Sequence, residues 1–196
     1  MFSQYNTFFL QKTTLYKLQR KIYTISANNQ IIGKIEETPA SHKKITNQLV
    51  KLVAYQFISF DLQVLDSNGH ILGWITKKQK GITTDFYLLS NEGELLATVQ
   101  PKLKLSTAIM TVIDKENKQL IQAKGDFGAI HYTVEACKNN TTTIASIQKR
   151  SLVYDSIQDS IHQHDGYYLT MEKTDALTKL ALLAIGIMID VYIYDV

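Results

Sequence analysis

Apolar and polar residues alternate along most of this chain, in short stretches that polar turns separate. Phe60, Leu62 and Val64 fall on one side of such a stretch, and Asp61 and Gln63 fall on the other. Alternation with a period of two is typical of a β-strand that is buried on one face only. The repeated order of strand, turn and strand therefore predicts a fold built from antiparallel hairpins.

The turns between these stretches are rich in Asn, Asp and Gly, which tolerate the left-handed backbone that tight hairpins need. Asp66-Ser67-Asn68-Gly69 and Ser90-Asn91-Glu92-Gly93 are two examples. Turn signals at this spacing are typical of a β-sandwich or a β-barrel. We predict about twelve strands from these signals: Lys21–Ser26, Gln30–Glu36, Phe57–Leu65, His70–Lys77, Thr84–Leu89, Glu94–Gln100, Thr107–Ile113, Gln119–Lys124, Ile130–Ala136, Thr141–Gln148, Tyr167–Met171 and Val191–Tyr194.

A different pattern, apolar without interruption, runs from Leu180 to Ile189. We predict a helix from Thr174 to about Asp190, capped at its start by Thr174 or Asp175. A helix that is apolar on every side must be buried on every side. A bilayer span needs ~20 apolar residues, so this shorter run favours a core helix, with a C-terminal membrane anchor as the alternative.

One helix can be buried on every side in a protein of hairpins if the sheet closes around it. A barrel of ~8 strands has room only for side chains, whereas one of ~11 can hold a helix along its axis. We therefore predict a mainly β fold, a closed antiparallel barrel of about twelve strands around a central apolar C-terminal helix. Gly186 would let that helix approach the wall closely. The prediction treats residues 1–196 as a single domain.

The segment Ser41–Val53 predicts a second, shorter helix. Ser41 can cap it, and Ile45, Leu49 and Leu52 recur at helical spacing. We expect this helix to cover one end of the barrel. Lysines among these residues leave open the alternative of a basic amphipathic helix on a membrane surface.

Composition narrows the class of protein. The chain has 196 residues, of which 45% are hydrophobic and 20% charged, and this balance is that of an ordinary globular domain. Its net charge of +3 is too small to indicate nucleic-acid binding. Cys137 is the only cysteine and cannot form an intrachain disulfide, which fits a reducing compartment. With no secretory signal recognised at the N-terminus, we expect a cytoplasmic protein.

Candidate chemistry is sparse. His162-Gln163-His164-Asp165 could supply metal ligands, but no second cluster completes a site, so a polar loop is the preferred interpretation. Gly125-Asp126-Phe127-Gly128 has the letters of a kinase motif without that enzyme's other parts. Cys137 lies beside Lys138, and we expect an inert thiol there. We expect no enzyme activity, no metal and no cofactor.

Short motifs follow one another in a distinctive order in the second half of the chain. Gly125-Asp126-Phe127 precedes the strand Ile130–Val134, and Ile144-Ala145-Ser146-Ile147-Gln148-Lys149 is the next strand. The aromatic strand Tyr167–Met171 and the apolar helix ending at Ile189-Asp190 come after them. This layout resembles the Tubby C-terminal-like superfamily, and within it the LURP-one-related proteins and their bacterial relatives of the YxjI type. Phospholipid scramblases are more distantly similar.

The resemblance implies a twelve-stranded barrel around a central apolar helix, in agreement with the fold predicted above. It implies less about function, because sites are grafted onto folds. Tubby domains bind phosphoinositide head groups through basic side chains, and scramblases are associated with calcium and membranes. Here the stretch from His164 to Asp175 holds three carboxylates, few for a calcium ion that takes ~6–8 oxygen ligands. The acylated cysteine cluster of scramblases is absent too, so we expect neither lipid scrambling nor calcium binding.

Basic residues provide the best functional lead. They lie at three predicted hairpin ends, and we take them as candidate lipid-binding residues: Lys77, Lys78 and Lys80, then Lys102 and Lys104, then Lys149 and Arg150. If they converge on one rim of the barrel, they would attract anionic lipid at ~1 kcal/mol per charge. The alternative is a set of scattered, solvated charges.

Two hypotheses about function follow. The first is a non-enzymatic binding module of the cytoplasm, peripheral to the membrane, that recognises an anionic membrane lipid or a protein partner and no nucleic acid. The second is a structural or interaction protein with no small-molecule ligand, which self-associates through an uncovered strand edge.

Overall fold

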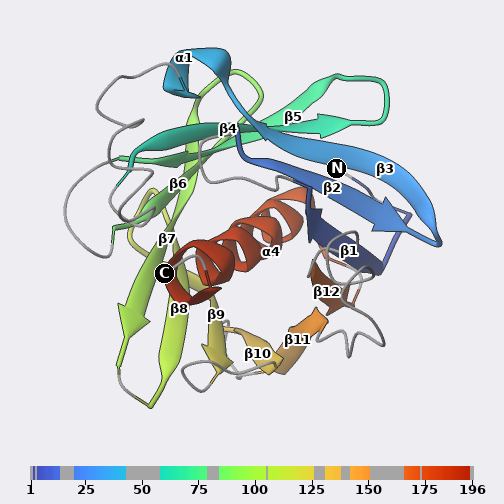
Figure 1. The fold of residues 1–196 in the computed structure, drawn as a ribbon. Helices are drawn as coiled ribbons and strands as arrows, with labels where there is room; N and C mark the ends of the chain where they lie inside the picture. The colour runs from blue at the N-terminus through green and yellow to red at the C-terminus, as the bar shows by residue number, and fades with distance from the viewer. Residues whose placement is uncertain are drawn as a thin grey trace.

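The computed structural model describes residues 2, 4–13, 20–42, 58–78, 84–104, 106–125, 131–137, 142–150, 166–172 and 174–194. Twelve strands and a long C-terminal helix make up most of this part of the chain (Figure 1). The strands are β1 (Thr7–Lys12), β2 (Ile22–Ala27), β3 (Gln30–Glu37), β4 (Phe60–Asp66), β5 (Ile71–Lys77), β6 (Phe86–Leu89), β7 (Leu95–Leu103), β8 (Ala108–Asp114), β9 (Gln119–Gly125), β10 (His131–Ala136), β11 (Thr142–Arg150) and β12 (Gly166–Met171).

The strands form one closed antiparallel barrel, as the sequence predicts. Each strand pairs with its neighbours in sequence, and β1 pairs with β12 to complete the circle. The closing ladder sets Thr7 opposite Thr170 and Gln11 opposite Gly166. Closure gives every one of these twelve strands a neighbour on both sides, and only short overhangs at strand ends are left unpaired.

The expected number of strands is right, but one member of the set is wrong. Residues 191–194 do not form a strand, because the helix α4 (Ala176–Ile189) continues as a π-helical segment, Asp190–Tyr194. The Asp190 backbone N–H bonds to the carbonyls of Gly186 and Ile187, which keeps the chain helical there. The twelfth strand is β1. Its sequence does not alternate between apolar and polar residues, because the apolar Phe9 lies on the outer face between the buried Phe8 and Leu10.

Helix α4 passes through the middle of the barrel (Figure 1) and is buried after its first turn. Every residue from Lys179 to Ile189 is buried. The barrel wall therefore provides the apolar surroundings that this helix needs, without a membrane. By length and composition alone, Ala176–Ile193 could span a bilayer, but 78% of that stretch is buried inside the protein. Asp175 caps the helix as predicted, accepting a 2.7 Å hydrogen bond from the Thr178 N–H.

The predicted helix Ser41–Val53 lies mostly outside the described residues. Within them, α1 (Pro39–His42) is a single turn. Ser41 does not cap it, since Thr38 accepts the Ser41 N–H at 3.2 Å and Pro39 occupies the first helical position. The Ser41 hydroxyl instead donates to the buried Glu37 carboxylate and accepts the Asp61 N–H.

Candidate functional site

The barrel has two chemically different ends. The tight turns after β2, β4, β6 and β8 lie at one end, where α4 also begins, and we call it the turn end. At the opposite end β5, β7, β9 and β11 finish and α4 stops, and we call it the basic end. Antiparallel pairing fixes this division, because consecutive strands run in opposite directions.

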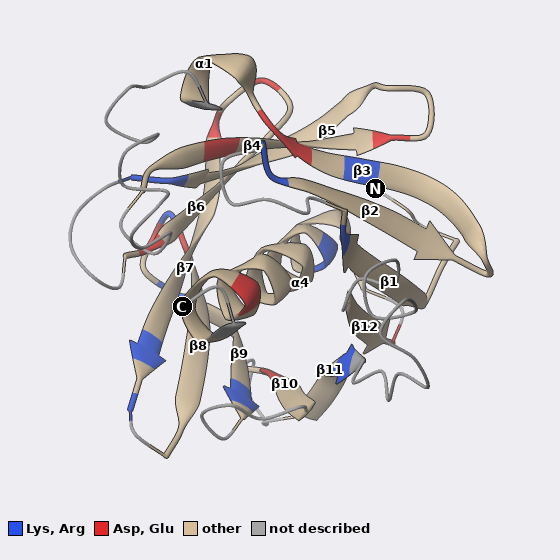
Figure 2. Cartoon of the chain, viewed as in Figure 1, with Lys and Arg blue, Asp and Glu red and all other residues tan. Residues whose placement is uncertain are grey.

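Four lysines lie at the basic end on one side of the barrel. Lys102 is near the end of β7, Lys104 follows that strand, and Lys149 is near the end of β11. Lys124, near the end of β9, joins them and pairs with Glu135 of β10 at 3.3 Å. We call these four residues the basic rim, and Figure 2 shows basic positions at the ends of β7, β9 and β11.

Three of the four rim residues come from the sequence prediction, and Lys124 does not. It follows the inward-facing Ala123 and therefore points outward at the end of a strand, which is the same signal that marks Lys102. Lys78 also lies at the basic end, next to β5, with its ammonium 5.3 Å from the Tyr87 ring centre. Lys80 lies outside the described residues, and for Arg150 only the backbone, at the end of β11, is described.

Lys77 is a correction to the predicted set, because its side chain lies inside the barrel and is 1% exposed. Gly73, Ile75 and Lys77 share the inward face of β5. The ammonium donates to the Ile58 carbonyl at 2.6 Å and lies 6.0 and 5.9 Å from the centres of the Phe60 and Tyr192 rings. Burial, with a contribution from Lys21, lowers the Lys77 pKa to about 8. A lysine in this position cannot face a lipid surface.

Carboxylates predominate at the turn end of the described chain. Seven lie in its turns and strand ends, against two exposed lysines, Lys115 and Lys118: Asp66, Glu92, Glu94, Asp114, Glu116, Glu172 and Asp175. Hydrogen bonds from the backbone and side chain of His70 and the backbone of Asn68 hold the pKa of Asp66 below its ordinary value. The two ends of the barrel are therefore of opposite charge.

A polar cluster inside the basic end holds the end of the helix. The Asp190 carboxylate accepts hydrogen bonds from the hydroxyls of Tyr23 at 2.7 Å and Tyr167 at 3.3 Å. The ammonium groups of Lys12 and Lys21 lie 3.5 and 4.0 Å from the same carboxylate. These contacts join α4 to β1, β2 and β12, and they set the position of the helix along the barrel axis.

The same helix is held at two further points. The Tyr192 hydroxyl accepts the Thr84 N–H at 3.0 Å and donates to the Thr84 carbonyl at 2.9 Å. At the turn end, the buried Lys179 ammonium donates to the carbonyls of Phe2 and Tyr5, at 2.8 and 3.3 Å. The buried polar groups at the two ends of α4 thus serve to fix the helix inside the wall.

Most of the other candidate chemistry lies outside the described residues. Residues 162–165 and 126–128 lie outside it, so the His-Gln-His-Asp and Gly-Asp-Phe-Gly motifs have no structural account. Cys137 is half-buried and accepts a hydrogen bond from the Gln119 amide at 3.0 Å. Among the residues with a defined placement, no three His, Cys, Asp or Glu side chains group to hold a metal ion.

Comparison with known proteins agrees with the architecture. The family model described as LURP-one-related matches residues 7–190, which is most of the chain and includes all twelve strands. No curated protein and no solved structure gives a significant match.

Proposed function

Because this chain belongs to the LURP-one-related family, we propose that it is a non-enzymatic cytoplasmic module that binds anionic membrane lipid through its basic rim. Its similarity to Tubby-like binding domains supports a binding role over a catalytic one. The observation that carries the proposal is the gathering of Lys102, Lys104, Lys124 and Lys149 at one end of the barrel.

Electrostatics favours this docking mode. A lysine near an anionic surface contributes up to ~1 kcal/mol, and Lys124 contributes less because Glu135 shares its charge, so the rim as a whole supplies an attraction suited to reversible binding. The acidic turn end is repelled by the same surface. A molecule with two oppositely charged ends is therefore oriented as it approaches the membrane, with the basic end first.

Barrel closure reduces the support for the self-association alternative. It needs a strand edge without a neighbour, and in the closed ladder only short overhangs such as residues 30–32 of β3 lack one. Membrane binding is accordingly the function we favour.

Co-sedimentation with vesicles tests the proposal. We expect binding to phosphatidylcholine vesicles that contain phosphatidylserine, no binding to pure phosphatidylcholine, and loss of binding between about 0.15 M and 1 M salt, where the Debye length falls from ~8 to ~3 Å. The double variant Lys102→Glu/Lys104→Glu should bind at least about tenfold more weakly, since each reversal removes ~1 kcal/mol or more.

The matched control is Lys115→Glu/Lys118→Glu, which changes the net charge equally at the turn end. We expect it to bind like the wild type. Equal losses in the two variants would mean that net charge, and not the basic rim, drives the interaction. No binding by the wild-type protein to either vesicle would reject the membrane hypothesis.

A further inference from the structure

Strand β3 extends past the end of β4 at the turn end. Its ladder with β2 already includes Gln30, opposite Ala27, but its ladder with β4 begins only at Gly33, opposite Asp66. After Asp66 the chain turns away through Ser67 toward β5. Residues 30–32 therefore have a strand beside them on one side only.

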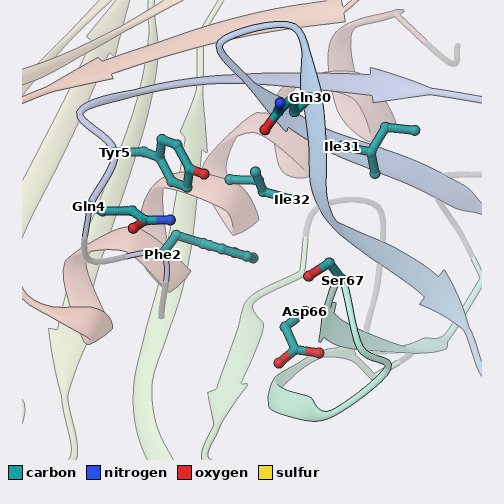
Figure 3. A pocket seen from close by; sticks show the side chains of 8 residues that line it. All are labelled: Phe2, Gln4, Tyr5, Gln30, Ile31, Ile32, Asp66 and Ser67. Atoms are coloured by element: carbon teal, nitrogen blue, oxygen red, sulfur yellow. The ribbon is translucent and has the colours of Figure 1, made fainter.

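A pocket of about 430 Å³ lies where β4 would have continued. Its walls are residues 30–32 of β3, Asp66 and Ser67 of the turn after β4, and Phe2, Gln4 and Tyr5 of the N-terminal segment. Figure 3 shows Ile32 pointing toward Phe2 and Tyr5, with Ile31 on the opposite side of the strand. The pocket thus adjoins the one stretch of β3 that has no second neighbour in the described ladder.

The inner wall of this pocket is held in place. The Phe2 and Tyr5 carbonyls accept hydrogen bonds from the buried Lys179, and the Phe2 ring packs edge-on against Phe8 with 5.6 Å between ring centres. A Cβ on Gly33 would lie 2.8 Å from the Phe2 ring, so glycine is what lets that ring lie against β3. The N-terminal segment and β3 are consequently fixed relative to each other, with the pocket preformed between them.

Two properties of the surroundings specify an occupant. Ile31 is 67% exposed. The other exposed large apolar side chains of the described residues, Ile71, Leu95 and Tyr168, are all less exposed. An added strand would place a side chain beside it and cover it. Among the described residues, Asp66 lines the pocket and no lysine or arginine does, at the end of the barrel where carboxylates predominate, so charge complementarity favours a partner with basic residues.

We propose that this pocket receives an extended, basic segment of a protein partner, which pairs with the free side of β3 as a short additional strand. Backbone pairing at an exposed strand end is a general way for a sheet to bind peptides, with alternate side chains supplying specificity. This second surface lies at the end of the barrel opposite the basic rim. The pocket therefore stays accessible to a partner while the basic end faces a membrane. The inference does not require that the membrane hypothesis is correct.

The test uses the full chain and a fluorescein-labelled octapeptide of alternating Lys and Val, with binding followed by fluorescence anisotropy. We expect saturable binding that Ile31→Lys weakens by roughly fivefold or more, because it removes an apolar cross-strand contact and places a like charge opposite the peptide. Ile71→Lys is the matched control, since Ile71 is also an exposed isoleucine of the turn end and does not line the pocket. It should change the affinity by less than about twofold.

Two further peptides define the binding mode. An octapeptide of alternating Glu and Val should bind much more weakly, and a Lys-Val peptide with central prolines, which cannot pair as a strand, should lose binding. Circular dichroism of both protein variants checks that the barrel is intact. Absence of binding by the wild type, equal loss in the two variants, or equal binding of the acidic peptide would each overturn the proposal. Loss of vesicle binding by Ile31→Lys, with peptide binding unchanged, would assign the pocket to the membrane and overturn it as well.

Discussion

Two adjacent lysines at the end of β5 have opposite environments. Lys77 and Lys78 are adjacent in the chain, yet the Lys77 side chain is inside the barrel and that of Lys78 is outside. Successive side chains of a strand point to opposite faces, so a shift of one residue decides whether a charge is buried or solvated. At this scale, a basic residue becomes a candidate contact only after its face of the sheet is known.

Burial of Lys77 gives the stability of the protein a dependence on pH. Its pKa is about 8 in the folded chain, against an ordinary value of 10.5. Between these two values the unfolded chain holds a proton on this lysine that the folded chain has released. The free energy of unfolding therefore contains a contribution that rises with pH across this window, and below it the full cost of burying the charge is present.

We predict that replacing Lys77 removes this dependence. Urea unfolding of the wild type, compared with Lys77→Met at several pH values from about 8 to about 10, should show the wild type gaining stability relative to the variant as pH rises. Lys77→Arg stays charged throughout this range and should lack the same gain. Parallel pH profiles for the three proteins would mean that the ammonium is solvated and not buried.

At the scale of a single element, α4 works as the core of the barrel. Its buried stretch includes Ala181, Ala184 and Gly186, and these small residues let the helix fit inside the wall. A Cβ on Gly186 would lie 3.1 Å from the Leu10 Cδ2 atom, closer than ordinary van der Waals contact. The space around this position therefore admits at most a small side chain.

Substitutions at Gly186 test how tightly the helix is enclosed. Gly186→Ala should change the free energy of unfolding by less than ~1 kcal/mol, since the gain in helix propensity offsets the slight crowding of Leu10. Gly186→Leu should destabilise the protein by ~3 kcal/mol or more, because the enclosing wall cannot move aside. The control is Ala176→Leu at the exposed start of α4, with an expected effect within about 0.5 kcal/mol. A mild effect of Gly186→Leu, measured by urea unfolding, would indicate a loosely held helix.

On the scale of the whole molecule, the main feature is the separation of charge along the barrel axis. The basic rim and the acidic turn end are joined by strands of about seven residues, and at ~3.3 Å per residue they are roughly 20 Å apart. A separation of this size exceeds the Debye length of ~8 Å at physiological salt, so a membrane acts mainly on the nearer end. The hydrophobic helix is enclosed and takes no part in this polarity.

This polarity predicts the orientation of the protein on an anionic vesicle. Cys137 is the only cysteine, so a Cys137→Ser background allows one labelling site at a time. Ser106→Cys places a fluorophore at the basic end, and Ser67→Cys places one at the turn end, both at exposed serines. Energy transfer to a lipid-borne acceptor should be markedly stronger from position 106. Equal transfer from both positions would show that the protein binds without a preferred orientation.

The sequence by itself determined the parts of the fold that depend on local pattern. Period-two alternation marks eleven of the twelve strands, and Asn, Asp and Gly mark the turns. The uninterrupted apolar run predicts a buried helix, and a closed sheet is the simplest way for a protein of hairpins to bury it on every side. These inferences need no long-range information, because side-chain periodicity and turn chemistry act over a few residues.

Tertiary structure alone decided which strands meet and which charges share an end. β1 has a blurred pattern and becomes a strand because β2 and β12 leave a place for it in the ladder. The end of α4 remains helical at 191–194, where alternation had suggested a strand, because Asp190 and Tyr192 are held inside the wall. Lys102, Lys124 and Lys149 lie far apart in sequence, and antiparallel pairing brings them to one end of the barrel. The candidate sites depend on these long-range pairings, since an exposed rim is defined by the register of neighbouring strands and not by the pattern within any one of them.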